Sequence, residues 1–214
     1  MSEPPTATSD AILQTVGRYY ADRLHEFGAT PRGVDWNSAE SQALRFDRLL
    51  ELVVDAPAGA SLLDVGCGYG ALLEAIRGRG LTLDYRGFDI SAEMIAAASA
   101  RHSGDADAAF TTDPGALRPA TFAVASGIFN VKLHHAQGEW RDYVLTTLKS
   151  LDAAAERGFA FNMLSTYSDP ERRRDTLYYA DPLELFDLCK RTYSPRVALL
   201  HDYPLYEFTM LVRK

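Results

Sequence analysis

Three glycines at alternate positions follow a short apolar run that contains one acidic residue. Residues 62–70 read Leu-Leu-Asp-Val-Gly-Cys-Gly-Tyr-Gly, which places Gly66, Gly68 and Gly70 just after Asp64. Glycine permits positive φ and lets a ligand approach the main chain closely. The dinucleotide fingerprint spaces its glycines as GxGxxG, whereas the spacing here is GxGxG. The stretch therefore predicts a ligand lying along the backbone and weakens an interpretation as a pyrophosphate site.

A second acidic residue, Asp89, stands at the end of the next predicted strand, within Phe88-Asp89-Ile90-Ser91. A carboxylate at this position can accept hydrogen bonds from both hydroxyls of a ribose. Nicotinamide enzymes also place an acid here, so Asp89 indicates a ribose without identifying the rest of the ligand. The alternative interpretation is that Asp89 serves only the start of a helix at Ser91.

Helices and strands alternate along the chain in a way that would bring both acids to one edge of a sheet. Periodicity predicts helices near 10–27, 37–53, 71–77, 91–98, 140–151 and 182–193, and strands at 61–65, 83–89, 109–112, 122–129, 159–164, 197–203 and 206–213. This alternation predicts a parallel sheet with helices on both faces, which binds ligands at the carboxyl ends of its strands. The last two strands are joined only by Pro204-Leu205, too short for a parallel crossover, so they form an antiparallel hairpin.

The segment Asp64–Gly70 resembles, at every position, the first motif of the class I S-adenosylmethionine (SAM)-dependent methyltransferases: an acidic residue, any residue, then GxGxG. The resemblance covers about residues 60–214 and implies an α/β fold with a doubly wound, seven-stranded, mostly parallel sheet, a C-terminal antiparallel hairpin and helices on both faces. We expect residues 10–57 to form a lid of two extra N-terminal helices, residues 58–214 to form the Rossmann-like core of the same domain, and residues 1–9 to be a disordered tail.

The same resemblance implies SAM as cofactor and S-adenosylhomocysteine (SAH) as product. It implies that Asp64 fixes the glycine loop from beneath, that Asp89 binds the ribose, and that Ile90 and Met94 lie near the adenine. Asp113 would meet the adenine amino group, although a loop Asp before Pro-Gly is equally a turn former. The remaining expected cofactor contacts are Tyr20, Arg45, Gly66, Cys67, Gly68, Tyr69, Gly70 and Ser126.

Some of these side chains have a stated chemical reason to contact SAM. Aromatic faces attract a sulfonium by ~0.5–2 kcal/mol, for which Tyr20, Tyr69 and Phe129 are candidates, although each could pack in the core instead. Arg45 could pair with the methionyl carboxylate or be an ordinary surface arginine. Cys67 is expected to be a small spacer whose backbone faces the ligand.

Catalytic residues are harder to predict, because methyl transfer needs a general base only if the acceptor loses a proton. His134 and Asn130, after the fourth predicted strand, are the candidates, with His134 as base because histidine titrates near neutral pH. The alternative is that His134 and His135 form a solvated pair. Rigid aromatic side chains with polar tips suit a small organic or sugar-like acceptor. The residues expected to bind it are Tyr19, Trp36, Phe129, Asn162, Tyr167 and Tyr178.

Composition narrows the possible partners. Apolar residues make up 47% of the chain and charged residues 24%, and no apolar run approaches the ~20 residues of a membrane span. The net charge of −7 disfavours nucleic acid as a partner. The two cysteines lack the spacing of a zinc site, and the N-terminus lacks the features of a secretory signal. We expect a cytoplasmic monomer or homodimer without a metal.

The sequence therefore predicts a SAM-dependent methyltransferase that transfers a methyl group to oxygen, nitrogen or carbon of a small molecule by in-line displacement. One alternative is a SAM-binding regulatory module that does not methylate, favoured by the weak catalytic signal. Another is an NAD-dependent oxidoreductase, disfavoured by the glycine spacing. The sequence does not identify the acceptor.

Overall fold

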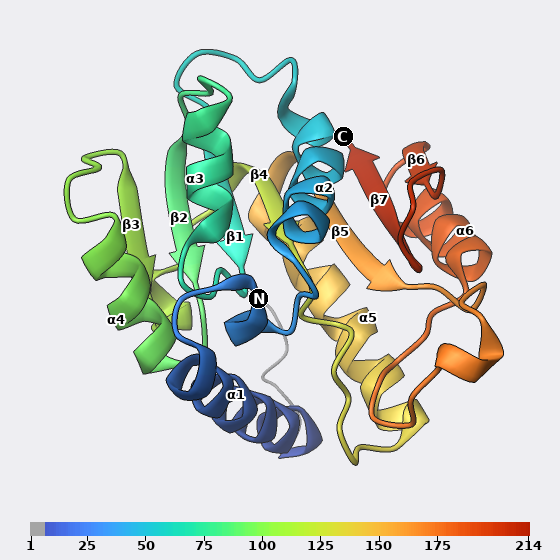
Figure 1. The fold of residues 1–214 in the computed structure, drawn as a ribbon. Helices are drawn as coiled ribbons and strands as arrows, with labels where there is room; N and C mark the ends of the chain where they lie inside the picture. The colour runs from blue at the N-terminus through green and yellow to red at the C-terminus, as the bar shows by residue number, and fades with distance from the viewer. Residues whose placement is uncertain (1–6) are drawn as a thin grey trace.

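A seven-stranded sheet forms the centre of the computed structural model, which describes residues 7–214 (Figure 1). The strands lie in the order β3-β2-β1-β4-β5-β7-β6. Among the described strands, β7 runs antiparallel to both of its neighbours, β5 and β6, and the other pairs of neighbouring strands are parallel. Their bounds are β1 (Ser61–Val65), β2 (Asp84–Phe88), β3 (Ala108–Thr111), β4 (Ala120–Ala125), β5 (Ala155–Leu164), β6 (Arg196–Leu200) and β7 (Glu207–Arg213). The predicted fold class is confirmed.

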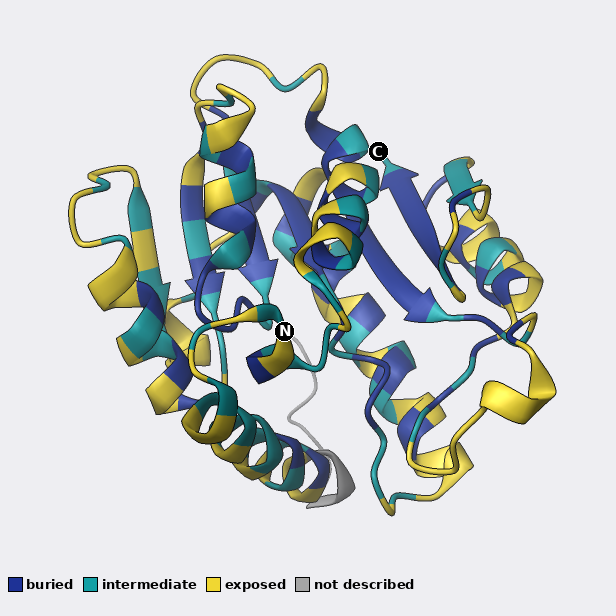
Figure 2. Cartoon of the chain, viewed as in Figure 1, coloured by how far each residue is buried: buried dark blue, intermediate teal, exposed yellow. Residues whose placement is uncertain are grey.

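Helices cover both faces of this sheet. The α-helices are α1 (Ala7–Phe27), α2 (Ala39–Leu50), α3 (Ala71–Gly78), α4 (Ala92–Arg101), α5 (Gln137–Ala154) and α6 (Pro182–Thr192), with short 3-10 helices η1 (Pro31–Val34), η2 (Glu51–Val53), η3 (Pro114–Ala116) and η4 (Pro170–Arg172). Helices α2 and α3 share one apolar core with the sheet, α5 and α6 share another, and α4 lies against the edge strand β3. Strands β1, β4, β5 and β7 are mostly buried, whereas the edge strands β3 and β6 are only partly covered (Figure 2).

The first helix lies apart from the two layers. In Figure 1 it crosses below the carboxyl ends of the strands, in contact with α4 and α5. It packs through Ile12 and Val16, which are 1% and 8% exposed. Helix α2, by contrast, packs on a face of the sheet through Phe46, Leu49 and Leu50, so it belongs to the core layer. The element that covers the carboxyl edge is therefore α1.

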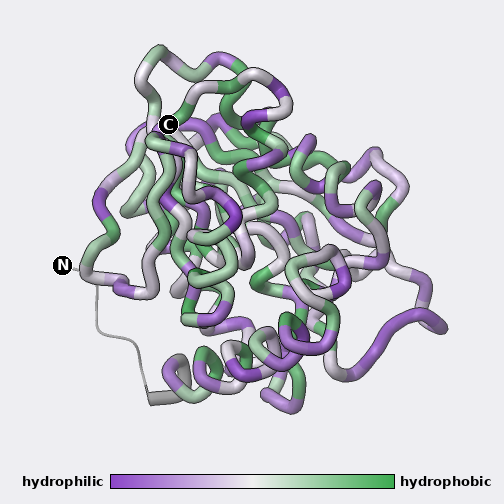
Figure 3. Tube along the Cα trace, turned by 60° about the vertical axis from the view of Figure 1, so that its left-hand side comes forward, coloured by the Kyte–Doolittle hydropathy of each residue, from purple (hydrophilic) through white to green (hydrophobic). Residues whose placement is uncertain are grey.

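The N-terminal boundary differs slightly from the prediction. Helix α1 begins at Ala7 rather than near Asp10. The rest of the predicted tail, residues 1–6, lies outside the described residues. Hydrophobic stretches gather in the centre of the molecule and hydrophilic ones on its outer loops (Figure 3). Within the described part of the chain, no helix combines the length and apolar character that a membrane crossing requires.

Two predicted strands extended three or more residues too far. Strand β4 ends at Ala125 rather than Phe129, because the chain turns at Gly127 with φ of 77°. Strand β6 ends at Leu200, so His201 and Asp202 lie in the connection to β7 and not on a strand. The hairpin is confirmed, but its predicted two-residue link is wrong, since residues 201–206 join the two strands.

Candidate functional site

A cavity of about 640 Å³ opens at the carboxyl ends of β1, β2 and β4. Its walls come from the glycine loop, the ends of β2 and β4, helix α1 and the segment before α2. The predicted cofactor residues that line it are Tyr20, Asp64, Gly66, Cys67, Gly68, Tyr69, Asp89, Ile90, Met94 and Ser126. Arg45, Gly70 and Asp113 are not among the described lining residues. The structure thus brings most of the predicted set to one place.

The glycine loop needs its glycines for the shape of the backbone. A Cβ added at Gly66, where φ is 78°, would lie 2.1 Å from Cγ2 of Ile128. At Gly70, where φ is 81°, it would meet the His102 ring at 2.8 Å. The amides of Gly66 and Cys67 both donate to the carbonyl oxygen of Phe88, at 2.7 and 3.0 Å. Close packing against Ile128 and His102 therefore accounts for two of the three glycines.

Asp89 joins the glycine loop to the start of α4. One carboxylate oxygen accepts from the Gly68 amide and the other from the Ser91 amide, both at 2.9 Å. Burial raises the pKa of Asp89, and these backbone hydrogen bonds oppose that rise. Asp89 therefore holds the start of α4 through Ser91 and also lines the cavity, so both interpretations of this residue are compatible with the structure.

Asp64 differs from its expected role. Its Oδ2 accepts a hydrogen bond of 2.6 Å from the Tyr85 hydroxyl, and its buried Oδ1 has no partner. Burial raises the pKa of Asp64 to about 7, although the Tyr85 bond acts against this. Asp64 is thus held by the neighbouring strand rather than by the loop. Register pairs Asp64 with Gly87, so Tyr85 lies two residues away on the same face of the sheet.

Gln42 lines the cavity beside the predicted residue Tyr69, although Gln42 itself was not predicted. Gln42 of α2 donates from Nε2 to the Tyr69 hydroxyl at 3.2 Å, and both side chains are buried and line the cavity. Arg45, one turn further along α2, turns away to a buried ion pair with Glu207. The described lining therefore offers a neutral hydrogen-bonding pair where a cationic residue was expected.

The end of β4 forms the opposite wall. Asn162 of β5 accepts from the Gly127 amide at 2.9 Å and donates to Ser126 Oγ at 3.3 Å. A Cβ at Gly127 would lie 2.5 Å from Cζ2 of Trp36, so the indole packs directly on this glycine. Asn162 is fully buried and fixes the turn, while Ser126, Gly127 and Trp36 reach the cavity.

The segment that carries Trp36 is tied to α1. Asp35, with φ of 60°, accepts from the Tyr19 hydroxyl at 2.6 Å and from Arg23 Nε at 2.7 Å. Burial, followed by the hydrogen bond to Asp35, raises the pKa of Tyr19 to about 12. Tyr19 therefore helps to hold Asp35, and with it the adjacent Trp36, in place beside α1.

Most of the predicted catalytic and acceptor-binding residues have other contacts. Among the described residues that line the cavity, Trp36 is present, whereas His134, Asn130, Tyr19, Phe129, Asn162, Tyr167 and Tyr178 are not. Asn130 accepts from the Leu164 amide at 3.0 Å. His134 is exposed and stacks on His135 with ring centroids 4.7 Å apart. The part of the loop after β4 that carries Asn130 and His134 thus does not line the cavity, whereas Ser126 and Gly127 at its start do.

Three of the aromatic residues predicted to bind the acceptor lie outside the cavity: Phe129, Tyr178 and Tyr167. Phe129 is fully buried in the core, where it contacts Phe161 and Tyr143. Tyr178 belongs to the same core and is 8% exposed, whereas Tyr167 is 65% exposed. Of the aromatic residues predicted for the acceptor, Trp36 is therefore the one that the structure places on the cavity wall.

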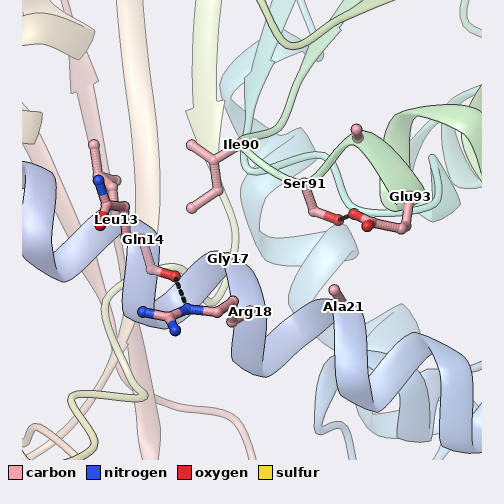
Figure 4. A pocket seen from close by; sticks show the side chains of 9 residues that line it. Leu13, Gln14, Gly17, Arg18, Ala21, Ile90, Ser91 and Glu93 are labelled. Carbon is pink, nitrogen blue, oxygen red and sulfur yellow. Dashed lines mark hydrogen bonds between the residues drawn. The ribbon is translucent and has the colours of Figure 1, made fainter.

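A smaller crevice of about 420 Å³ separates α1 from the start of α4 (Figure 4). Ile90 points into it between Leu13 and Ser91, and Gly17 of α1 faces the Ile90 side chain. A Cβ at Gly17 would lie 3.4 Å from Cδ1 of Ile90. Ile90 lines both this crevice and the larger cavity, as Leu13 of α1 does, so α1 and the predicted adenine side meet here.

The sheet order, with β7 inserted antiparallel between β5 and β6, and the glycine loop and acid at the ends of β1 and β2 define a class I, Rossmann-like methyltransferase. The chain belongs to the methyltransferase domain family, whose family model matches residues 36–193. Rv1506c of Mycobacterium tuberculosis, provisionally named a methyltransferase, is 54% identical over 162 residues, which are 76% of this chain and 98% of that protein.

Solved structures share the fold at low sequence identity. Magnesium protoporphyrin IX methyltransferase from Synechocystis PCC 6803, with bound SAM, has a TM-score of 0.62 at 14% identity and covers 99% of both chains. The DhpI–SAH complex has a TM-score of 0.62 at 15% identity and covers 94% of this chain and 97% of its own. These likenesses agree with the sheet topology described above.

Proposed function

We propose that this methyltransferase takes its methyl group from SAM, releases SAH, and methylates oxygen, nitrogen or carbon of a small molecule by in-line displacement. The observation that carries the proposal is the shared cavity wall of the glycine loop and Asp89, which is bonded to the loop through the Gly68 amide. When bound, SAM supplies an electrophilic methyl group on a sulfonium.

The residues on the cavity wall fit the parts of SAM. Asp64 lines the cavity and its buried Oδ1 has no partner, so we assign this carboxylate to the methionyl ammonium. Asp89 would accept from the ribose hydroxyls, and Ile90 and Met94 would contact the adenine. Gln42 Nε2 and the Tyr69 hydroxyl would donate to the methionyl carboxylate, in place of Arg45.

The protein's contribution to the reaction is mainly positioning. Holding two reactants in a near-attack geometry can supply ~7–11 kcal/mol. Histidine and lysine do not occur among the described cavity-lining residues, so base catalysis by His134 is a prediction that depends on movement of its loop. If His134 is the base, His134→Ala lowers kcat about a hundredfold or more.

The structural neighbours support the cofactor and the size of the acceptor. One was solved with SAM and is named for a porphyrin substrate, and the other was solved with SAH. The net charge of −7 supports an acceptor other than nucleic acid. We extend the proposal to a monomer or homodimer that acts on a small-molecule acceptor.

Activity is tested by incubating the protein with methyl-labelled SAM and a panel of small alcohols, carboxylic acids, phenols and amines, and following SAH formation and label transfer. We expect SAH to accumulate with at least one acceptor, and not with the Asp89→Ala variant. Tight SAM binding without turnover on any acceptor would favour the alternative, a SAM-binding module that does not methylate.

The affinity for SAH should depend on pH through Asp64. The ligand ammonium favours the carboxylate, so below a pKa of about 7 binding must first ionise Asp64. Each pH unit below that pKa makes the free energy of SAH binding about 1.4 kcal/mol less favourable. The affinity should therefore fall by up to about tenfold per pH unit below the pKa and stay constant above neutral pH. Calorimetry between pH 5.5 and pH 8.5 measures the slope.

The matched variant for this prediction is Asp64→Asn, which keeps the shape of the side chain and cannot ionise. It should bind SAH more weakly at pH 8 and should lose most of the slope below neutral pH. A slope equal to that of the wild type would contradict the assignment of the ammonium to Asp64.

A further inference from the structure

The indole of Trp36 is held on two sides. The Arg45 guanidinium lies over one face, with Cζ 4.0 Å from the ring centroid. The far edge of the ring abuts Gly127, where an added Cβ would come within 2.6 Å of both Cζ2 and Cη2. Trp36 also lines the cavity, so the face opposite Arg45 is the one left for a ligand.

Arg45 is itself fixed by a buried ion pair. Its Nε and Nη2 donate to the two carboxylate oxygens of Glu207 at 2.7 and 2.6 Å, and Nη1 donates to the Ser41 carbonyl oxygen at 2.7 Å. The two side chains are 7% and 2% exposed. Glu207 therefore orients the guanidinium and also cancels its charge beside the indole.

The Trp36 ring lies where we expect the sulfonium end of the ligand. Val34, two residues before Trp36, lies 3.4 Å from where a Cβ at Gly68 would be, so the segment passes over the glycine loop. Trp36 then reaches Gly127 at the end of β4, next to Ser126. The segment 34–36 thus runs from the glycine loop to the end of β4, and Trp36 lies at the end next to β4.

We propose that Trp36 is the wall against which the sulfonium and its methyl group lie, and that the Arg45–Glu207 ion pair is the positioning device that sets this ring and keeps it attractive to a cation. The inference rests on SAM being the methyl donor. A tryptophan face attracts a cation, whereas an uncompensated guanidinium on its other face would repel one. Glu207 therefore matters most to the charged ligand, SAM, and little to its neutral counterpart, SAH.

The test compares SAM and SAH, which differ by one methyl group and one positive charge. In Glu207→Gln the affinity for SAM should fall about three- to tenfold relative to the affinity for SAH. Trp36→Ala should lower the same ratio. Calorimetry gives both dissociation constants for each variant, and SAH binding shows that the fold is retained.

Two further variants distinguish an effect of the guanidinium charge from a general effect of breaking a buried ion pair. Arg45→Met combined with Glu207→Leu removes both charges, and its SAM to SAH ratio should stay within about twofold of the wild type because no guanidinium remains beside the ring. Asp105→Asn breaks a comparable bidentate pair with Arg77, at 2.7 and 3.1 Å, near the other edge of the sheet. It should leave the ratio unchanged.

An unchanged ratio in both Glu207→Gln and Trp36→Ala, in proteins that bind SAH normally, would overturn the inference while leaving the proposed function intact. If Glu207→Gln does not fold, Trp36→Ala decides alone, since the ion pair remains in that variant. Failure of the wild type to bind either ligand would overturn the proposed function itself.

Discussion

Replacing Gly68 with valine is expected to lower the affinity for SAM and SAH by at least about a hundredfold. Gly68 has φ of 53°, a left-handed conformation that a β-branched residue adopts only with strain. Its Cβ would lie 3.4 Å from Val34 Cγ1 and 3.9 Å from Met94 Sδ, so the valine methyl groups would occupy the cavity. Calorimetry with SAH measures the loss, and circular dichroism shows whether the fold persists.

Gly78→Ala is the matched control for this substitution. Gly78 ends α3, and a Cβ there meets no atom within 4 Å. Its affinity for SAH should stay within about twofold of the wild type, and its helix should be slightly more stable. A folded Gly68→Val protein that binds SAH within tenfold of the wild type would show that the ligand does not lie along this backbone.

Replacing Asp89 with alanine is expected to lower the affinity for SAH by about a hundredfold. The change removes the proposed ribose contact, and a hydrogen bond to a charged group is worth about 1.5–3 kcal/mol. It also removes the acceptors that hold the Gly68 and Ser91 amides in place. Asp89→Asn should give an intermediate loss, because its amide oxygen can still accept from one of these groups. Calorimetry at pH 8 compares the two variants.

Asp84→Asn provides the control for Asp89, since Asp84 begins the same strand at the opposite edge and pairs with Arg86 at the surface. It should bind SAH as the wild type does. A folded Asp89→Ala protein with unchanged affinity would remove Asp89 from the binding site and leave it only the contact with the start of α4.

The shared position of Asp64, the glycine loop and Asp89 on one cavity wall was predictable because its signals are local. Asp64 is the penultimate residue of β1, the glycine loop follows β1 and Asp89 follows β2, and parallel strands bring their carboxyl ends to one edge. The hairpin was predictable for a similar reason, since a short link between two strands excludes a parallel crossover. These features depend on spacing along the chain and on no distant partner.

The features of the site that the sequence did not predict depend on contacts between segments far apart in the chain. Arg45 and Glu207 are 162 residues apart, so nothing near Arg45 indicates that its guanidinium is already occupied. The turn at Gly127 is held by Asn162 of the next strand and by the Trp36 ring, which ends β4 before the predicted boundary. That early turn explains why Ser126 and Gly127 reach the cavity while Asn130 and His134 do not.

Calorimetric titration of the wild-type protein with SAM and, separately, with SAH at pH 8 shows whether the cavity binds the methyl donor. We expect one site per chain for each ligand, with dissociation constants in the micromolar range or below. Absence of binding to both ligands at high micromolar concentration would contradict this expectation.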